Sequence, residues 1–191
     1  MKVILGSTSK RRQELMNLLK IPYEVMGSNE DEVYDKSKNL YEQCLDIAYH
    51  KALNVYKRTE GERIVIGSDT VVILDNKILG KPKDKEDAFR MVKELSGKKH
   101  EVVTSISVLV YKDGVYKEEK LYDIATVFVS AMSDEEINDW VNNHSVLDKA
   151  GAYAIQDEFG KFIERIEGDY YTIVGFPISK VYQILKKYLT N

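Results

Sequence analysis

The chain lacks the features that mark several classes of protein. Its 191 residues include a single cysteine, Cys44, so an internal disulfide cannot form, as is typical of a reducing compartment. Three prolines and eleven glycines are too few for a low-complexity chain. No apolar run approaches the ~18 residues of a membrane-spanning helix, and the apolar run before Gly6 is too short for a secretory signal. We therefore expect a soluble, cytoplasmic protein.

Neither sign of charge dominates. The 28 lysines and arginines nearly balance 31 aspartates and glutamates, which leaves a net charge of −3 spread along the whole chain. Such a balance produces no global field that would attract nucleic acid or an anionic membrane, so we expect neither partner. The hydrophobic content of 43% suffices for one sizeable core. With no internal repeat or linker, residues 1–191 are predicted to form a single domain with two lobes.

Hydrophobic periodicity predicts strands interleaved with helices. The dipeptides Asp75-Asn76 and Asp113-Gly114 signal hairpin turns. Because hairpins join some strands and helices join others, we predict an α/β fold (α+β) with a mixed sheet. The predicted strands are Lys2–Gly6, Tyr23–Met26, Ile64–Leu74, Lys77–Leu79, Val102–Tyr111, Val115–Val129 and Phe162–Ile166. The predicted helices follow Ser9 (with Leu15, Leu18 and Leu19 on one face), span Leu40–Lys57, run from Asp84 to Gly97, begin at a Ser133 capping box and begin at Pro177.

The strand Ile64–Leu74 carries an acid, Asp69, between two apolar, β-branched runs. A carboxylate in such a run is expensive to desolvate unless something pairs with it. Asp69 is therefore either a structural acid bonded to backbone amides or the working acid of a cleft. An aspartyl nucleophile of the phosphatase kind would be followed two residues later by a second acid, and Val71 at that position weakens the covalent interpretation.

A serine-rich turn leads from the first strand into the first helix. Ser7 and Ser9 supply hydroxyls where a helix start presents backbone amides, and Arg11 and Arg12 add donors that suit phosphate. Cations at a helix N-terminus oppose the macrodipole. Two interpretations remain: a capped helix with a solvated basic first turn, or a phosphate-binding site.

Other candidate residues are weaker when each is taken alone. Phosphate-loop and dinucleotide-binding glycine patterns are absent from the sequence, and the three histidines show no metal-ligand spacing. Lys51 on a helix and Lys81 after a hairpin read as surface lysines, and Glu32 lies in an acidic, solvated loop. Cys44 falls on an amphipathic helix and reads as a core residue.

Taken together, several stretches resemble the Maf family of nucleotide pyrophosphatases, relatives of the house-cleaning inosine triphosphatases. They occur in family order and span nearly the whole chain. The residues that carry the resemblance are Gly6–Arg12, Lys51-Ala52, Ile66–Val72, Ile78–Pro82, Leu95–Gly97 and Asp148–Gln156.

The resemblance implies a fold of two lobes with a central cleft, and hydrolysis of a nucleoside triphosphate to a monophosphate and pyrophosphate. It implies Asp69 as general base, Glu32 as a second carboxylate, and Mg²⁺ or Mn²⁺ held by Asp69 and Glu32. The substrate-binding residues that it implies are Ser7, Arg11, Arg12, Glu32, Lys51, Thr70, Lys81 and Gln156. Among these, Arg12, Thr70 and Gln156 match the branch that acts on dTTP and UTP, and a homodimer is expected from the family.

Departures from the family pattern are modest. Lys10 stands where proline is common, Gly6 and Ser68 replace usual alanines, Ala125 falls at a common threonine and Ala154 at a frequent glycine. Three alternatives remain: a 7-methyl-GTP pyrophosphatase, a nucleotide-binding regulator of cell division and septum formation with weak hydrolysis, and an unrelated phosphohydrolase that releases orthophosphate.

Overall fold

The structure is a computed structural model that describes residues 1–29 and 33–189. Within these residues the strands form one seven-stranded mixed sheet in the order β2-β1-β3-β5-β6-β7, with β4 paired to β3. β1 is parallel to both β2 and β3, whereas β3–β4 and β6–β7 are antiparallel. The predicted mixed α/β sheet is thereby confirmed. The strands are β1 (Lys2–Leu5), β2 (Glu24–Val25), β3 (Arg63–Leu74), β4 (Lys77–Leu79), β5 (Lys99–Lys112), β6 (Val115–Val129) and β7 (Ile163–Glu167).

Both predicted hairpin turns are present. Asp75 and Asn76 have φ angles of 49° and 61°, and Asp113 and Gly114 have φ angles of 52° and 75°. Two consecutive residues with positive φ form the turn whose twist matches that of the flanking strands, and Asn, Asp and Gly tolerate this conformation best. The sequence signal worked because it depends only on local backbone chemistry.

The described residues form six α-helices. Capping residues predicted where several of these helices begin. Asp84 caps α3, and the capping box at Ser133 opens α4. α5 and the short 3₁₀ segments around residues 150–152 and 158–162 were not predicted, because each is too short to show a hydrophobic period. The helices are α1 (Lys10–Leu18), α2 (Leu40–Lys57), α3 (Lys85–Leu95), α4 (Asp134–Asn143), α5 (Tyr170–Val174) and α6 (Ile178–Leu189).

The predicted apolar face of the first helix was partly wrong. α1 buries Leu15 and Met16, whereas Leu18 is 54% exposed. On the nine-residue α1 the buried stripe is narrow, so an apolar residue three positions beyond Leu15 falls outside it. In α2, Cys44 is buried, as predicted, whereas its neighbour Leu45 is half-buried.

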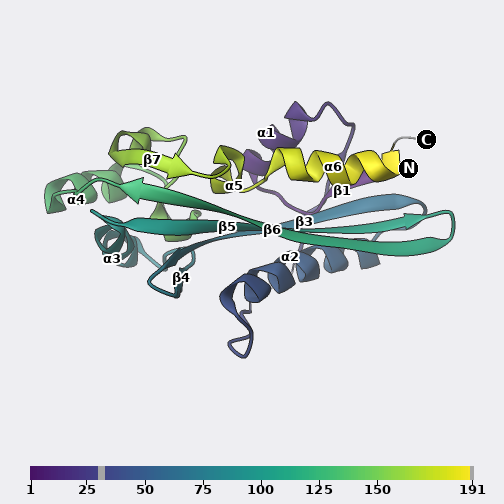
Figure 1. Cartoon of the computed structure of the whole chain (residues 1–191), viewed down its shortest axis with the longest axis horizontal. Coiled ribbons are helices and arrows are strands. Elements are labelled where there is room, and N and C mark those ends of the chain that lie inside the picture. Colours follow the sequence, from purple (N-terminus) through teal and green to yellow (C-terminus); the bar gives the residue numbers. More distant parts are fainter. Residues whose placement is uncertain (30–32, 190–191) are drawn as a thin grey trace. The chain divides into compact units, whose positions relative to one another are not determined.

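The chain divides into two compact units. Unit 1 comprises residues 1–69, 104–123 and 175–191, and unit 2 comprises residues 70–103 and 124–174. β3, β5 and β6 contribute residues to both. In unit 1, α2 lies on one side of the strands, whereas α1 and α6 lie on the other (Figure 1). The apolar cluster on the α2 side contains Ile4, Ala52, Val55, Val65 and Leu109.

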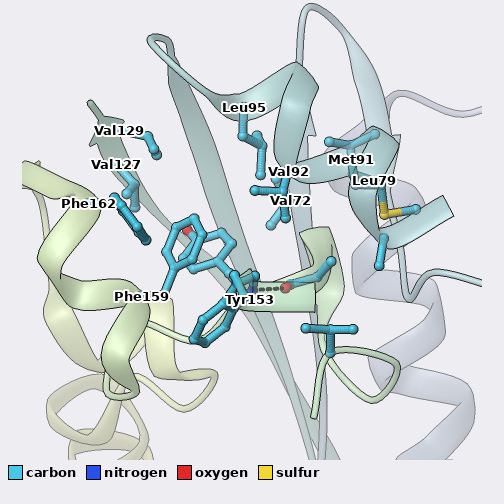
Figure 2. Close-up of a cluster of buried hydrophobic side chains, with 14 of the residues drawn as sticks. Val72, Leu79, Met91, Val92, Leu95, Val127, Val129, Tyr153, Phe159 and Phe162 are labelled. Atoms are coloured by element: carbon cyan, nitrogen blue, oxygen red, sulfur yellow. Dashed lines mark hydrogen bonds between the residues drawn. The ribbon is translucent and has the colours of Figure 1, made fainter. Parts of the chain in front are cut away.

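Unit 2 has a larger core, rich in aromatic residues. The ring of Tyr153 stacks on Phe159 with centroids 4.7 Å apart, and aliphatic residues of α3, β3 and β6 pack around them (Figure 2). The indole N–H of Trp140 donates to the carbonyl oxygen of Ala152 over 3.0 Å. These contacts fix the segment that carries the motif Asp148–Gln156. Across the described residues, no helix combines the length and apolar character needed to span a membrane.

Candidate functional site

Asp69 forms a buried ion pair with Lys51. The ammonium Nζ of Lys51, on α2, lies 2.7 Å from Oδ1 of Asp69, on β3. The Asp69 side chain is 5% exposed and that of Lys51 is 13% exposed. Because a buried carboxylate is costly without a counter-charge, the pair offsets the desolvation that made Asp69 unusual in the sequence. The sequence left open that Asp69 is a structural acid bonded to backbone amides. The bond to Lys51 shows that backbone amides are not its only partners.

Gly67 is what allows α2 to lie so close to β3. A β-carbon at this position would lie 2.2 Å from the carbonyl oxygen of Ala48 and 2.7 Å from the backbone nitrogen of Ala52. Real β-carbons essentially never come so near to backbone atoms. Alternate residues of a strand point to the same face, so Gly67 and Asp69 share the face that α2 covers. Because residue 67 has no side chain, α2 lies close enough to β3 for Nζ of Lys51 to bond the carboxylate of Asp69.

Ser68 points to the opposite face of β3. Its hydroxyl, fully buried, donates to the carbonyl oxygen of Gly175 over 3.2 Å. The same carbonyl oxygen accepts from Nε of Arg12 over 3.0 Å. Arg12 is therefore half-buried and tied to a neighbouring segment, and the interpretation of a solvated basic first turn is wrong for this residue.

Ser7 completes the cluster around Arg12. Its hydroxyl accepts from Nη1 of Arg12 over 3.4 Å and from the backbone N–H of Ser9 over 3.2 Å. β1 and β3 run parallel, and the N–H of Gly6 donates to the carbonyl of Ile66 over 2.7 Å. Consequently Ser7 leaves β1 at the level where β3 presents residues 67–69. Arg11 precedes Arg12 on α1 and is half-buried.

Three of the residues implied by the resemblance belong to unit 2. Thr70 follows Asp69 on β3 and is half-buried, whereas Lys81 and Gln156 are exposed. The N–H of Gly151 donates over 3.0 Å to the carbonyl of Gly80, which fixes the segment before Gln156 beside the residue that precedes Lys81.

Glycine is required at position 151. Its φ is +66°, and a β-carbon would lie 2.9 Å from a methyl group of Val72. The small residues of the motif Asp148–Gln156 therefore serve close packing against β3 within unit 2. At Gly151 the lack of a side chain is thus explained by packing against Val72.

The predicted metal ligands are only partly visible. Glu32 lies outside the described residues, and among those described no cluster of three histidine, cysteine, aspartate or glutamate residues could hold an ion. Mg²⁺ bound with a nucleotide needs only one or two protein carboxylates, because phosphate oxygens and water fill the other positions. The carboxylate of Asp69 is a donor of that type and fits such an ion.

Cys44 is buried, as predicted, and the three histidines lie in different environments. His100 Nε2 lies 2.7 Å from the hydroxyl of Tyr153, and burial lowers the pKa of His100 to about 4. His50 is exposed, and His144 stacks on Trp140. Burial, followed by the charge of Asp69, raises the pKa of the Cys44 thiol to about 12, so this buried cysteine stays protonated.

Three residues that position Lys51 and Arg12 were not predicted from the sequence. Gly67, Ser68 and Gly175 carry no charge, and what they do depends on segments far apart in the chain. The one local signal was Gly67, because a glycine inside a buried strand often marks a close approach of another backbone segment.

Comparison with solved structures defines the class of fold. The Ham1 protein of Staphylococcus aureus matches with a TM-score of 0.52 and 13% sequence identity, over 98% of this chain and 99% of that one. A HAM1 protein from Coxiella burnetii matches with a TM-score of 0.50 and 12% identity, over the same shares. At these identities the likeness concerns the fold alone, which is the mixed α/β fold of Ham1 proteins.

Sequence comparison is more specific. The family model described as Maf-like protein matches residues 2–188, and the chain belongs to this family. A protein of Thermoanaerobacter sp. (strain X514) named dTTP/UTP pyrophosphatase is 42% identical over 187 residues, 98% of this chain and 96% of that protein. A protein of Clostridium beijerinckii with the same name is 42% identical over 192 residues, 98% and 99% of the two chains.

Proposed function

We propose that the protein hydrolyses dTTP and UTP to the nucleoside monophosphate and pyrophosphate. Its relatives of about 42% identity, aligned over nearly their whole length, are named for that reaction. The observation that carries the proposal is the buried Lys51–Asp69 pair, one residue along β3 from the Ser68–Gly175–Arg12 cluster. A carboxylate on β3, with cations of α1 and α2 bonded to that short strand segment directly or through Gly175, supplies what water attack on a polyphosphate requires.

In this proposal Asp69 is the general base. One carboxylate oxygen is held by Lys51, which fixes the orientation of the group and offsets its charge. The carboxylate accepts a proton from water as the water oxygen attacks the α-phosphorus. The bond from that phosphorus to the bridging oxygen breaks, and pyrophosphate leaves with the bonding electron pair.

The cations stabilise the charge of the substrate and of the leaving group. A triphosphate carries about four negative charges near neutral pH. Arg11, Arg12 and Lys81 supply positive charges, as does Lys51, although Asp69 already offsets the charge of Lys51. The hydroxyl of Ser7 adds a donor to phosphate. Because Gly175 and Ser7 hold Arg12, its planar fork of donors is oriented by the protein, which reduces the entropy lost on binding.

We further propose that Asp69, with Glu32 as the second carboxylate, holds Mg²⁺ or Mn²⁺ together with the nucleotide. When bound, the ion neutralises phosphate charge and polarises the phosphoryl oxygens. Thr70 and Gln156 are proposed to read the pyrimidine. A primary amide such as that of Gln156 both donates and accepts, and a base that leaves it unpaired is disfavoured.

The test is a panel of nucleoside triphosphates with the products identified. Release of pyrophosphate, fastest from dTTP and UTP, supports the proposal. Binding of nucleotide without pyrophosphate release would favour a regulatory protein, orthophosphate as the product would favour an unrelated phosphohydrolase, and preference for 7-methyl-GTP would overturn the assignment of the base.

The general base is tested in the same assay. Asp69→Asn keeps the shape of the side chain and removes its basicity, so turnover is expected to fall at least ~100-fold. Asp139→Asn, an exposed aspartate on α4 that bonds Asn143, is the matched control and should retain turnover. Near-normal turnover by Asp69→Asn would remove Asp69 from this role.

A further inference from the structure

One carbonyl oxygen joins three separate segments of unit 1. The Gly175 oxygen accepts from Nε of Arg12, on α1, over 3.0 Å and from the hydroxyl of Ser68, on β3, over 3.2 Å. Gly175 itself lies between α5 and α6. The three residues are distant in sequence, with 163 positions between Arg12 and Gly175 and 107 between Ser68 and Gly175. The orientation of this one peptide group therefore determines where the Arg12 guanidinium can bond.

The Gly175 peptide needs a contact to hold its orientation. Gly175 has a φ of +112°, which side-chain-bearing residues rarely adopt, and glycine itself restricts the backbone least of all residues. Ser68 is 0% exposed, so any acceptor for its hydroxyl has to come from the protein and not from bulk water. The carbonyl of Gly175 satisfies that hydroxyl, and the resulting bond fixes the carbonyl from the side opposite Asp69.

The consequence concerns the guanidinium of Arg12. Its Nε bonds Gly175 and its Nη1 bonds Ser7, so two fixed acceptors set the plane of the fork. If the Gly175 peptide changed its orientation, the guanidinium plane of Arg12 would change with it, because Nε of Arg12 bonds that carbonyl oxygen. A guanidinium stabilises phosphate through the geometry of its donors as well as through charge, so a loosened plane weakens transition-state stabilisation.

We infer that Ser68 is a positioning residue, which orients Arg12 toward the phosphates through the carbonyl of Gly175. The inference rests on the proposed pyrophosphatase function. In that function, two consecutive residues of β3 act on opposite faces of the strand. Asp69 presents the base toward α2, and Ser68 anchors Arg12 on the α1 side through Gly175.

The experiment is a double-mutant cycle on dTTP hydrolysis with wild type, Ser68→Ala, Arg12→Ala and the double variant. Removing one buried neutral hydrogen bond is expected to lower kcat/KM about tenfold, and Arg12→Ala is expected to lower it further. Because Ser68 acts through Arg12, the double variant should match Arg12→Ala within about twofold. An equal further loss on Ser68→Ala in the Arg12→Ala background would overturn the inference, as would unchanged kcat/KM in Ser68→Ala alone.

A matched control separates positioning from loss of a buried hydroxyl. Ser105 and Ser107, on β5 in unit 1, are also fully buried, and within the described residues their hydroxyls lack hydrogen-bond partners. Ser105→Ala and Ser107→Ala should leave kcat/KM unchanged. A loss in these variants equal to that of Ser68→Ala would show a general effect of core serines and would overturn the inference.

A binding measurement keeps the inference separate from the proposed function. If the wild-type protein releases no pyrophosphate from dTTP, the proposed function fails on that result alone. The same four variants are then titrated with inorganic pyrophosphate by calorimetry. Weaker binding in Ser68→Ala, without further weakening in the Arg12→Ala background, supports the positioning role. Equal affinity in wild type and Ser68→Ala contradicts it.

Discussion

A β-carbon on Gly67 would lie 2.2 Å from the carbonyl oxygen of Ala48. This relationship sets the distance between β3 and α2, and through it the reach of Lys51 to Asp69. Gly67→Ala is therefore expected to push α2 from the strand, to lower the free energy of unfolding by about 1–3 kcal/mol and to reduce turnover. Urea denaturation and the pyrophosphatase assay measure the two effects.

Gly80→Ala is the control for Gly67→Ala. A β-carbon at Gly80 would meet no described atom within 4 Å, and the φ angle there is not among the positive ones. Its free energy of unfolding should stay within about 0.5 kcal/mol of the wild type. Equal stability of the two variants would show that the contact with Ala48 does not limit the approach of the helix.

The buried Lys51–Asp69 pair leads to a second prediction. Lys51→Met leaves a buried carboxylate without its counter-charge, which is expected to cost about 3 kcal/mol in the free energy of unfolding. Adding Asp69→Asn removes that charge and should restore much of the loss. Urea denaturation of both variants near neutral pH measures this coupling. A double variant less stable than Lys51→Met would contradict the prediction.

The chain contains a second ion pair of the same length for comparison. Lys180 on α6 lies 2.7 Å from Asp123; the side chain of Lys180 is 49% exposed and that of Asp123 is 15% exposed. Exposed pairs contribute little because water screens them. Lys180→Met should therefore cost less than about 1 kcal/mol. The contrast between the two variants measures how the exposure of the lysine weakens an ion pair of equal length.

The sequence predicted those parts of the fold that depend on local chemistry. The turn at Asp113-Gly114, the cap at Asp84 and the capping box at Ser133 each involve residues within a few positions of one another. The bond from Ser68 to Gly175 spans 107 positions and carries no periodic signal. Such contacts appear only when strands and helices are placed.

The site residues show the same division. Asp69 was a candidate because the free energy needed to desolvate a carboxylate in an apolar strand is large, and this can be judged from the sequence. Its partner Lys51 read as a surface residue, because a lysine on an amphipathic helix gives no sign of its burial. Arg12 attracted notice through its conflict with the helix dipole, but the carbonyl that holds it could not be predicted.

Removal of divalent metal gives a third prediction. Chelation by EDTA should abolish dTTP hydrolysis, and an excess of Mg²⁺ or Mn²⁺ should restore it, because the triphosphate charge needs neutralisation beyond the protein's cations. EDTA saturated with Mg²⁺ beforehand is the control and should leave turnover unchanged. Full activity in free chelator would rule out the metal requirement. The melting temperature with dTTP present should also rise on addition of Mg²⁺.

The buried His100 predicts how stability changes in acid. Burial lowers the pKa of His100 from 6.5 to about 4, so the folded protein holds it neutral while the unfolded chain protonates it below about 6.5. Its contribution to stability is present above pH 6.5 and is lost as the pH falls toward 4, by about 3 kcal/mol in all.

His100→Gln isolates that contribution. The variant is expected to be less stable than the wild type at pH 7, because it disturbs the buried contact with Tyr153. The difference should narrow as the pH falls from 6.5 to 4, since only the wild type must take up a proton at this position on unfolding. Urea denaturation at several pH values measures the difference, with His50→Gln, at an exposed histidine, as control. A difference that stays constant across this range would show that His100 is protonated equally in the folded and unfolded states.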